Sequence, residues 1–228
     1  MAGTVMHLVI ADKLLEALKI KNPAMFYCGN LAPDAVMSRD NYEREMKNHT
    51  HFKEGLKPYE FRIEANQKDY YKKLNEFVNA FLDIEDQDYE LLLGYIVHIL
   101  TDELYLLKYY EDYICELEAN NIFPSDVDFS KKYVNDVDRI DWFLAESYEF
   151  RFAMPEILFS LSDYEIPGMI SSEELEKSKK FIVHKNFDTT HIKENLEVQS
   201  YEKSMNFIDL CVEEIPKLLS SRYNIDFM

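Results

Sequence analysis

A histidine and an aspartate four positions apart form the sharpest chemical signal in this chain of 228 residues. The segment GYIVHILTD carries them as His98 and Asp102. On a helix this spacing puts both side chains on one face, about one turn apart. Because a buried aspartate beside a buried histidine is costly unless the two are bonded together or share a cation, the motif indicates either a His–Asp hydrogen bond in a helical core or a metal site.

Three further segments carry residues that bind metals or move protons. The segment GNLAPDA contains Asp34, which suits a metal ligand or a general base, although an Asx-turn or an N-cap is the alternative. The segment KNHTHF contains His49 and His51, and because positions i and i+2 point apart on a helix, at most one of them joins a metal if this segment is helical. His7 lies on the apolar stripe of the first expected helix, so a core histidine is the alternative to a ligand.

Taken together, these segments offer three imidazoles and two carboxylates for a shared metal site. Helical bundles build such sites from side chains on facing helices. The mixture of nitrogen and oxygen donors suits Zn²⁺, and ligand type alone fits Fe, Mn or Ni as well. The candidate ligands are His7, Asp34, His51, His98 and Asp102, with Asp34 and Asp102 as the candidate catalytic residues.

Long helices must position these residues, because the chain has only five glycines for tight turns. We expect one all-α domain spanning residues 1–228, a multi-helix bundle. Pro23, Gly29 and Pro33 predict a non-helical stretch between the first two helices. Pro216 is expected to kink or end the last helix. The predicted helices cover about 5–19, 59–82, 88–118, 130–147, 155–161, 171–184 and 201–221, with Thr4 as the first N-cap and Ser171 with Glu174 as a capping box.

Charge and composition limit the partners. The formal net charge of −18 disfavours binding to nucleic acids and other polyanions. The longest apolar stretch, Leu91 to Leu100, is too short to span a bilayer. The N-terminus has no basic region followed by a cleavage site, and the three cysteines are odd in number and far apart, so we expect a cytoplasmic protein. The composition leaves its oligomeric state open.

The run of MHLVIADK, GNLAPDA, K-x-x-THF and GY-x-x-H-x-x-TD resembles the zinc-dependent phospholipase C family, chiefly its bacterial branch. That family is all-helical and related to the zinc-dependent single-strand nucleases. The resemblance covers roughly residues 1–110. It implies that His51, His98 and Asp102 hold one zinc ion, and that His7 and Asp34 hold a second, with Asp102 as the candidate bridge.

The resemblance also implies His51 rather than His49, because the family's histidine precedes the phenylalanine of THF. The family's third ion is held by two more histidines and a glutamate shortly after the H-x₃-D helix. Here the next histidine after Asp102 is His184, and the set His184, His191 and Glu194 has a different place and spacing. One or two ions are therefore expected instead of three.

Two functions from different classes follow. The first is a metal-dependent phosphoester hydrolase, similar to phospholipase C, in which metal-activated water attacks a small phosphoester or a phospholipid head group. The second is a non-catalytic helical module that its metal ions stabilise. An open coordination position distinguishes them, since a catalytic ion keeps a water and a structural ion is closed by protein ligands. A single-strand nuclease would follow from kinship alone, and the acidic charge disfavours it.

Overall fold

A computed structural model of the chain describes residues 2–56, 60–61, 63–82 and 89–225, apart from the side chains of residues 81 and 82. Helices dominate these residues, and their only extended pairing is an isolated bridge between Ile166 and Ile170. The expected all-α class is therefore confirmed. None of the described helices combines the length and the apolarity needed to cross a membrane.

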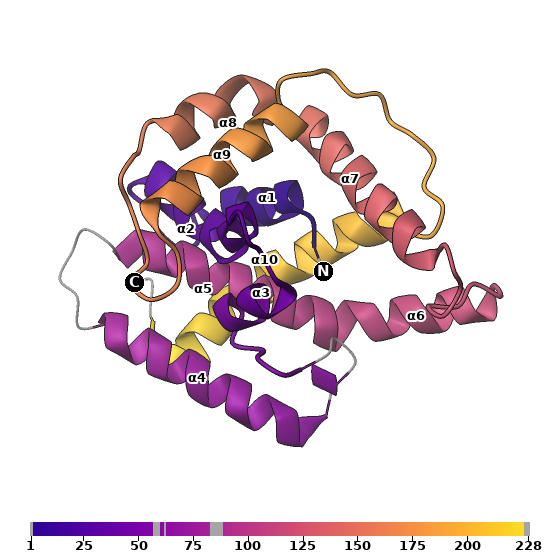
Figure 1. Cartoon of the computed structure of the whole chain (residues 1–228), viewed down its shortest axis with the longest axis horizontal. Helices are drawn as coiled ribbons and strands as arrows, with labels where there is room; N and C mark the ends of the chain where they lie inside the picture. The colour runs from indigo at the N-terminus through magenta and orange to yellow at the C-terminus, as the bar shows by residue number, and fades with distance from the viewer. Residues whose placement is uncertain (1, 57–59, 62, 83–88, 226–228) are drawn as a thin grey trace.

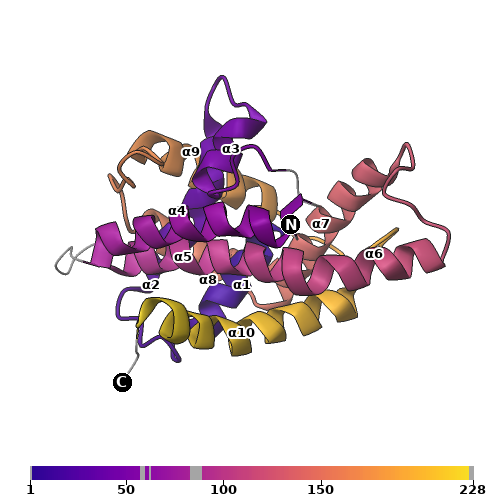
Figure 2. The same cartoon turned by 90° about the horizontal axis from the view of Figure 1, so that it is seen from below.

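Three helices form the centre of the bundle: α1 (Thr4–Leu14), α2 (Pro23–Ala35) and α5 (Tyr89–Leu104). α5 continues through a π-helical stretch, η3 (Tyr105–Tyr109), into α6 (Tyr110–Ala119), and Figure 2 shows the three as one long rod. Nearly every residue of α5 is buried, as expected for a helix that is apolar on all sides.

α2 crosses α5 closely because each helix has a glycine at the crossing point. A Cβ atom on Gly29 would lie 1.7 Å from the carbonyl oxygen of Leu91, and one on Gly94 would lie 2.1 Å from that of Phe26. Any side chain at either position would force the two backbones apart. The two glycines therefore bring the backbone of α2 within reach of side chains on α5.

α2 corrects the expectation that this stretch is not helical. Asn22 caps the helix by accepting a hydrogen bond from the backbone N–H of Met25, and Pro23 stands at the start, where its missing N–H costs nothing. Pro33 lies inside the last turn. A proline there costs about 3 kcal/mol in an isolated helix, and the burial of α2 against α5 offsets this cost. Asp34 therefore lies on a helix and not on a loop.

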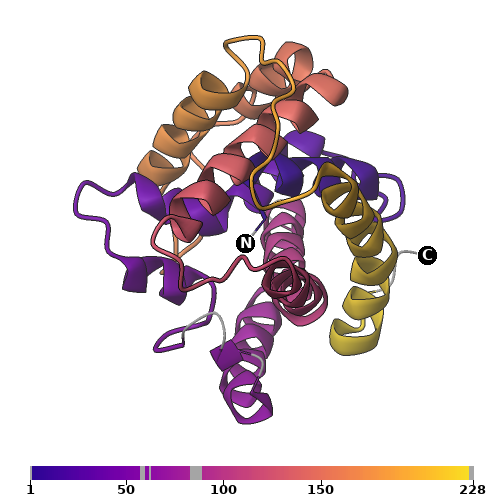
Figure 3. The same cartoon turned by 90° about the vertical axis from the view of Figure 1, so that its right-hand side faces the viewer.

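The remaining elements surround this centre, as Figure 1 shows. In Figure 3, α10 and the group formed by α7, α8 and α9 lie on different sides of the rod. These elements are η1 (Val36–Ser38), α3 (Arg44–Thr50), α4 (Glu64–Leu82), α7 (Phe129–Ser147), α8 (Phe150–Phe159), α9 (Ser172–Asn186) and α10 (Tyr201–Tyr223).

Several predicted boundaries are wrong, and in two cases a proline is the reason. Pro155 lies inside α8 and does not start it, while α10 continues past Pro216. The N-cap of α1 is Gly3 and not Thr4. α4 begins at Glu64, later than expected, and the predicted start at Tyr59 lies outside the described residues. The capping box of Ser171 and Glu174 is confirmed.

Candidate metal centre

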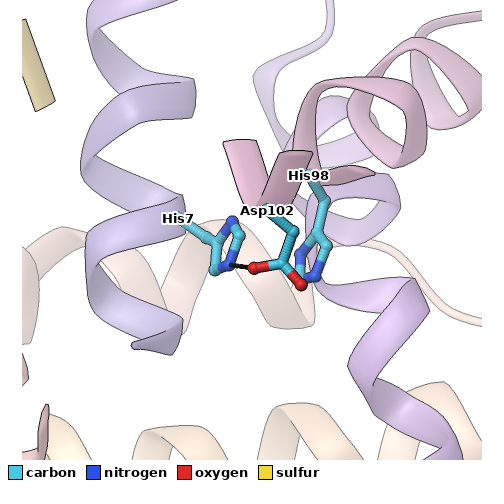
Figure 4. Close-up of side chains that lie close together, drawn as sticks. All are labelled: His7, His98 and Asp102. Atoms are coloured by element: carbon cyan, nitrogen blue, oxygen red, sulfur yellow. Dashed lines mark ion pairs between the residues drawn. The ribbon is translucent and has the colours of Figure 1, made fainter. Parts of the chain in front are cut away.

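His7, His98 and Asp102 meet where α1 packs against α5. All three are almost completely buried, and each offers a ligand atom within 4.8 Å of the others. The rings of His7 and His98 are stacked with centroids 3.8 Å apart and planes 4° from parallel. Figure 4 shows the carboxylate of Asp102 beside them, with its Oδ1 3.6 Å from Nε2 of His7.

Asp34 and His51 approach the same histidine from α2 and from the end of α3. The ligand atoms of Asp34, His51 and His98 also lie within 4.8 Å of one another. Nε2 of His51 lies 3.3 Å from Oδ1 of Asp34 and 3.6 Å from Oδ2 of Asp102. The structure thus brings all five candidate ligands together, but it groups them differently from the expected sets. His98 belongs to both groups, and His7 joins it together with Asp102 instead of with Asp34.

Backbone carbonyls fix the orientation of two imidazoles. Nδ1 of His98 lies 2.7 Å from the carbonyl oxygen of Asn30, and Nδ1 of His51 lies 2.9 Å from that of Lys47. A carbonyl oxygen only accepts, so each Nδ1 donates its proton and the lone pair of the neutral ring remains on Nε2. Burial lowers the pKa of His51 and holds that of His98 well below its usual range, which keeps both rings neutral.

The two Nε2 atoms face each other at 3.3 Å. With both Nδ1 atoms protonated, neither neutral ring has a proton to place between them, so two lone pairs point at one space. A cation in that space would relieve this repulsion. Metal-binding histidines commonly have this arrangement, in which the outer nitrogen donates to a carbonyl and the inner nitrogen faces the ion.

The carboxylate of Asp102 points to the same conclusion. Both of its oxygens are buried, and neither accepts a hydrogen bond from any of the residues that the structure describes. A buried carboxylate without donors is costly unless a cation lies close to it. Its two oxygens face different neighbours, Oδ1 toward His7 and Oδ2 toward His51. The donor set therefore fits a divalent ion of the zinc type, with Asp102 able to reach either group.

Two lysines neutralise the carboxylates from the outer side. Nζ of Lys47 lies 2.5 Å from Oδ1 of Asp34, and Nζ of Lys53 lies 3.7 Å from Oδ2 of Asp102. Burial is the largest single influence and raises the pKa of each aspartate, but the ammonium groups and the neighbouring histidines together outweigh it, and both pKa values are held well below the usual range. Burial lowers the pKa of Lys53, and Asp102 opposes this shift.

A pocket of about 240 Å³ opens beside the cluster and reaches His51. Its lining combines polar and charged side chains with apolar ones. The lining consists of Arg44, Glu45, Lys47, Asn48, His51, Lys53, Gly55, Leu56, Phe61 and Leu106.

The C-terminal half supports the cluster from outside. Asp141 of α7 is buried and accepts a hydrogen bond of 3.1 Å from the backbone N–H of Met6, in the first turn of α1. This bond holds the helix end that carries His7. Sequence reasoning missed this contact, and it gave no role to Lys47, which begins the K-x-x-THF motif, or to Lys53, which directly follows it.

Other histidines lie apart from the cluster. The side chain of His49 is 52% exposed and pairs with Glu54. His184 is exposed and pairs with Asp188, while His191 stacks on Trp142. Glu194 pairs with Arg139. Among the described residues, none of these groups forms a second cluster of metal-type ligands.

Comparison with known proteins agrees with these motifs. Residues 6–104 match the family model described as zinc dependent phospholipase C. The match confirms the resemblance for this N-terminal region. Searches of curated proteins and of solved structures find no significant match. The family is zinc-dependent, and the matched region contains the His/Asp groups that could hold a metal.

Proposed function

We propose that the protein is a metal-dependent phosphoester hydrolase whose site holds one or two divalent ions, with zinc as the preferred metal. The ligands are His7, Asp34, His51, His98 and Asp102. The observation that carries this proposal is the pocket at His51, because it gives a substrate access to a cluster whose lone pairs converge.

A bound divalent ion would lower the pKa of a coordinated water toward neutrality and reduce the negative charge on a phosphoryl oxygen. The chain supplies the rest. His51 and His98 are held as neutral donors by the carbonyls behind them. Asp102 offers one oxygen to each group of ligands. Asp34 acts as a ligand more readily than as a general base, because Lys47 keeps its pKa low and a weak base takes up protons poorly.

The substrate is a small phosphoester. The pocket volume of about 240 Å³ lies below the usual range for drug-sized ligands. The apolar side chains in its lining, Leu56, Phe61 and Leu106, suit a short organic group on the ester. A phospholipid head group with its chains outside the pocket is the second source of such an ester. A cytoplasmic location belongs to the same proposal and is supported by three free cysteines.

Metal removal and replacement test this function. Purified protein is dialysed against a chelator, reloaded with Zn²⁺, Mn²⁺ or Fe²⁺, and assayed on a panel of phosphomonoesters and phosphodiesters. We expect activity that disappears with the metal, returns with it, and is absent from Asp102→Asn.

The depth of burial favours a second candidate, the metal-stabilised module without turnover, because His7, His51, His98 and Asp102 are each at most 2% exposed. Spectroscopy of the Co²⁺-substituted protein reports the coordination number and any exchangeable water. Metal-loaded protein that hydrolyses no ester in the panel and holds its ions with protein ligands alone would establish the module and overturn the hydrolase.

A further inference from the structure

Lys53 is a buried lysine that lines the pocket beside the cluster. The residue is 7% exposed, and among the described residues its Nζ has no hydrogen-bond partner. Its nearest charged contact, Oδ2 of Asp102, is 3.7 Å away, and the ring centroid of Phe61 is 5.3 Å away. A buried ammonium group has three protons to donate, and leaving them unused is costly. The side chain lines the pocket beside the cluster, so an anion bound there would receive these protons.

The backbone before Lys53 is held in an unusual conformation. Phe52 has a φ of 58°, in the left-handed region that a bulky residue rarely adopts. Its ring is buried against Phe77 and Tyr95, with centroids 5.2 and 6.2 Å away. The hydroxyl of Tyr95 also donates to the carbonyl oxygen of Thr50. These contacts hold the turn that directs His51 and Lys53 to the same site. Backbone strain of the kind seen at Phe52 recurs at functional sites.

The charges around the pocket favour a ligand with two negative charges. Lys47 and Lys53 balance Asp34 and Asp102, so the four side chains carry no net charge together. One divalent ion bound among these side chains would give the site a charge of about +2. A phosphomonoester is a dianion near neutral pH, since its second pKa is about 6. A phosphodiester carries a single negative charge and would leave half of the positive charge of the metal-loaded site unbalanced.

We propose that Lys53 anchors the phosphoryl group of the substrate and makes this site selective for dianionic phosphomonoesters over phosphodiesters. This inference rests on the proposed hydrolase function for its catalytic part. The binding part, Lys53 donating to a phosphoryl oxygen, stands without turnover. Lys47 is less suited to this role because its ammonium group is already paired closely with Asp34.

Binding of inorganic phosphate to the zinc-loaded protein, followed by calorimetry, tests the anchor. Lys53→Met is expected to bind phosphate about 10- to 100-fold more weakly, because it removes a charged hydrogen-bond donor. Its metal content stays equal to that of the wild type. Lys53→Arg keeps the charge and recovers most of the affinity. Lys217→Met is the matched control, because it removes the same charge from an exposed lysine on α10 that pairs with Glu213 and Glu214.

The selectivity is tested on the wild type, so it does not depend on how a variant folds. Inorganic phosphate is expected to bind at least about 10-fold more tightly than dimethyl phosphate, a monoanion of similar shape. In the hydrolysis assay, Lys53→Met should lower kcat/KM for monoesters more than for diesters. Equal affinity of the wild type for the two anions, or phosphate binding unchanged in Lys53→Met, overturns the proposal.

The two proposals fail in different ways. Wild-type protein that binds phosphate through Lys53 but hydrolyses nothing refutes the hydrolase and keeps the anchor. If the wild type and Lys53→Met hydrolyse phosphoesters at the same rate, the hydrolase proposal stands and the anchor is refuted.

Discussion

Asp102 in the N-terminal region and Asp136 in the C-terminal half are both buried aspartates, and they differ in what surrounds their oxygens. Asp136 lies on α7 and accepts backbone N–H bonds of 2.7–3.0 Å from Glu197, Val198 and Gln199. Arg139 adds a contact of 3.2 Å to the same carboxylate. The acid therefore organises the chain between α9 and α10.

Asp102 has no such donors in the described part of the chain, where its oxygens face histidines and an ammonium group at 3.6–3.7 Å. A carboxylate saturated by backbone donors stabilises a loop and has little capacity left for a ligand. A carboxylate without donors has its lone pairs free for a cation. Burial alone does not distinguish these two roles, whereas the number of hydrogen-bond donors that reach the carboxylate does.

Asp141 lies between these two cases. The backbone at the start of α1 donates to it, but burial has the larger influence on its pKa, and its substitution is expected to give the largest change in stability. Burial raises its pKa to about 7, with Asp138 adding to the rise while the N–H groups of Val5 and Met6 and the charge of Lys185 oppose it. An acid whose folded pKa exceeds its unfolded value of 3.8 stabilises the fold fully below that value and loses this contribution as pH rises through 7.

The free energy of unfolding of the wild type should therefore fall relative to Asp141→Asn between pH 4 and pH 8, by up to about 4 kcal/mol. Urea denaturation of both proteins across this range measures the difference. A difference that does not change with pH would mean that the backbone donors dominate and that Asp141 resembles Asp136.

Asp136→Ala should destabilise the fold without affecting the metal. It leaves the N–H groups of Glu197, Val198 and Gln199 without their acceptor, at a cost of about 3 kcal/mol in the free energy of unfolding. Urea denaturation measures the loss, and elemental analysis of the folded variant should give the wild-type metal content. Loss of metal from folded Asp136→Ala would break the distinction between the two acids.

Asp102→Asn should have the opposite effect to Asp136→Ala, because it should reduce the metal affinity and retain the helical fold. Removal of a charged ligand that faces both groups should weaken Zn²⁺ binding by at least about 100-fold, the upper end of what loss of an outer partner costs. Competition with a fluorescent zinc chelator measures the affinity, and circular dichroism checks the helices. Unchanged affinity would remove Asp102 from the ligand set.

His51→Ala and His49→Ala form a matched pair with the smallest expected effect. His51 is one of several imidazoles in the cluster, so its loss should weaken zinc binding by about 10- to 100-fold. His49 pairs with Glu54 at the surface, so its loss should leave the affinity unchanged. The same competition assay serves both variants, and a larger effect from His49→Ala would reverse the assignment within the THF motif.

The amino-acid sequence determined the features that depend on local spacing. Scarce glycine and helical periodicity predicted the all-α class, and the i,i+4 spacing placed His98 and Asp102 on one face of α5. The capping box at Ser171 could be read directly, because its hydrogen bonds join residues three positions apart. The family resemblance rested on the same kind of short motif.

Only the tertiary structure decided what depends on contacts between distant segments. The sequence around Pro33 predicts a break, but packing against α5 through Gly29 and Gly94 keeps α2 helical and brings the carbonyl oxygen of Asn30 to His98. The different surroundings of Asp102 and Asp136 arise in the same way. Donors 61–63 positions away saturate Asp136, and none of the residues described in the structure donates to Asp102. The sequence contains both aspartates, but long-range packing determines which of them accepts backbone hydrogen bonds and which has oxygens available to a cation.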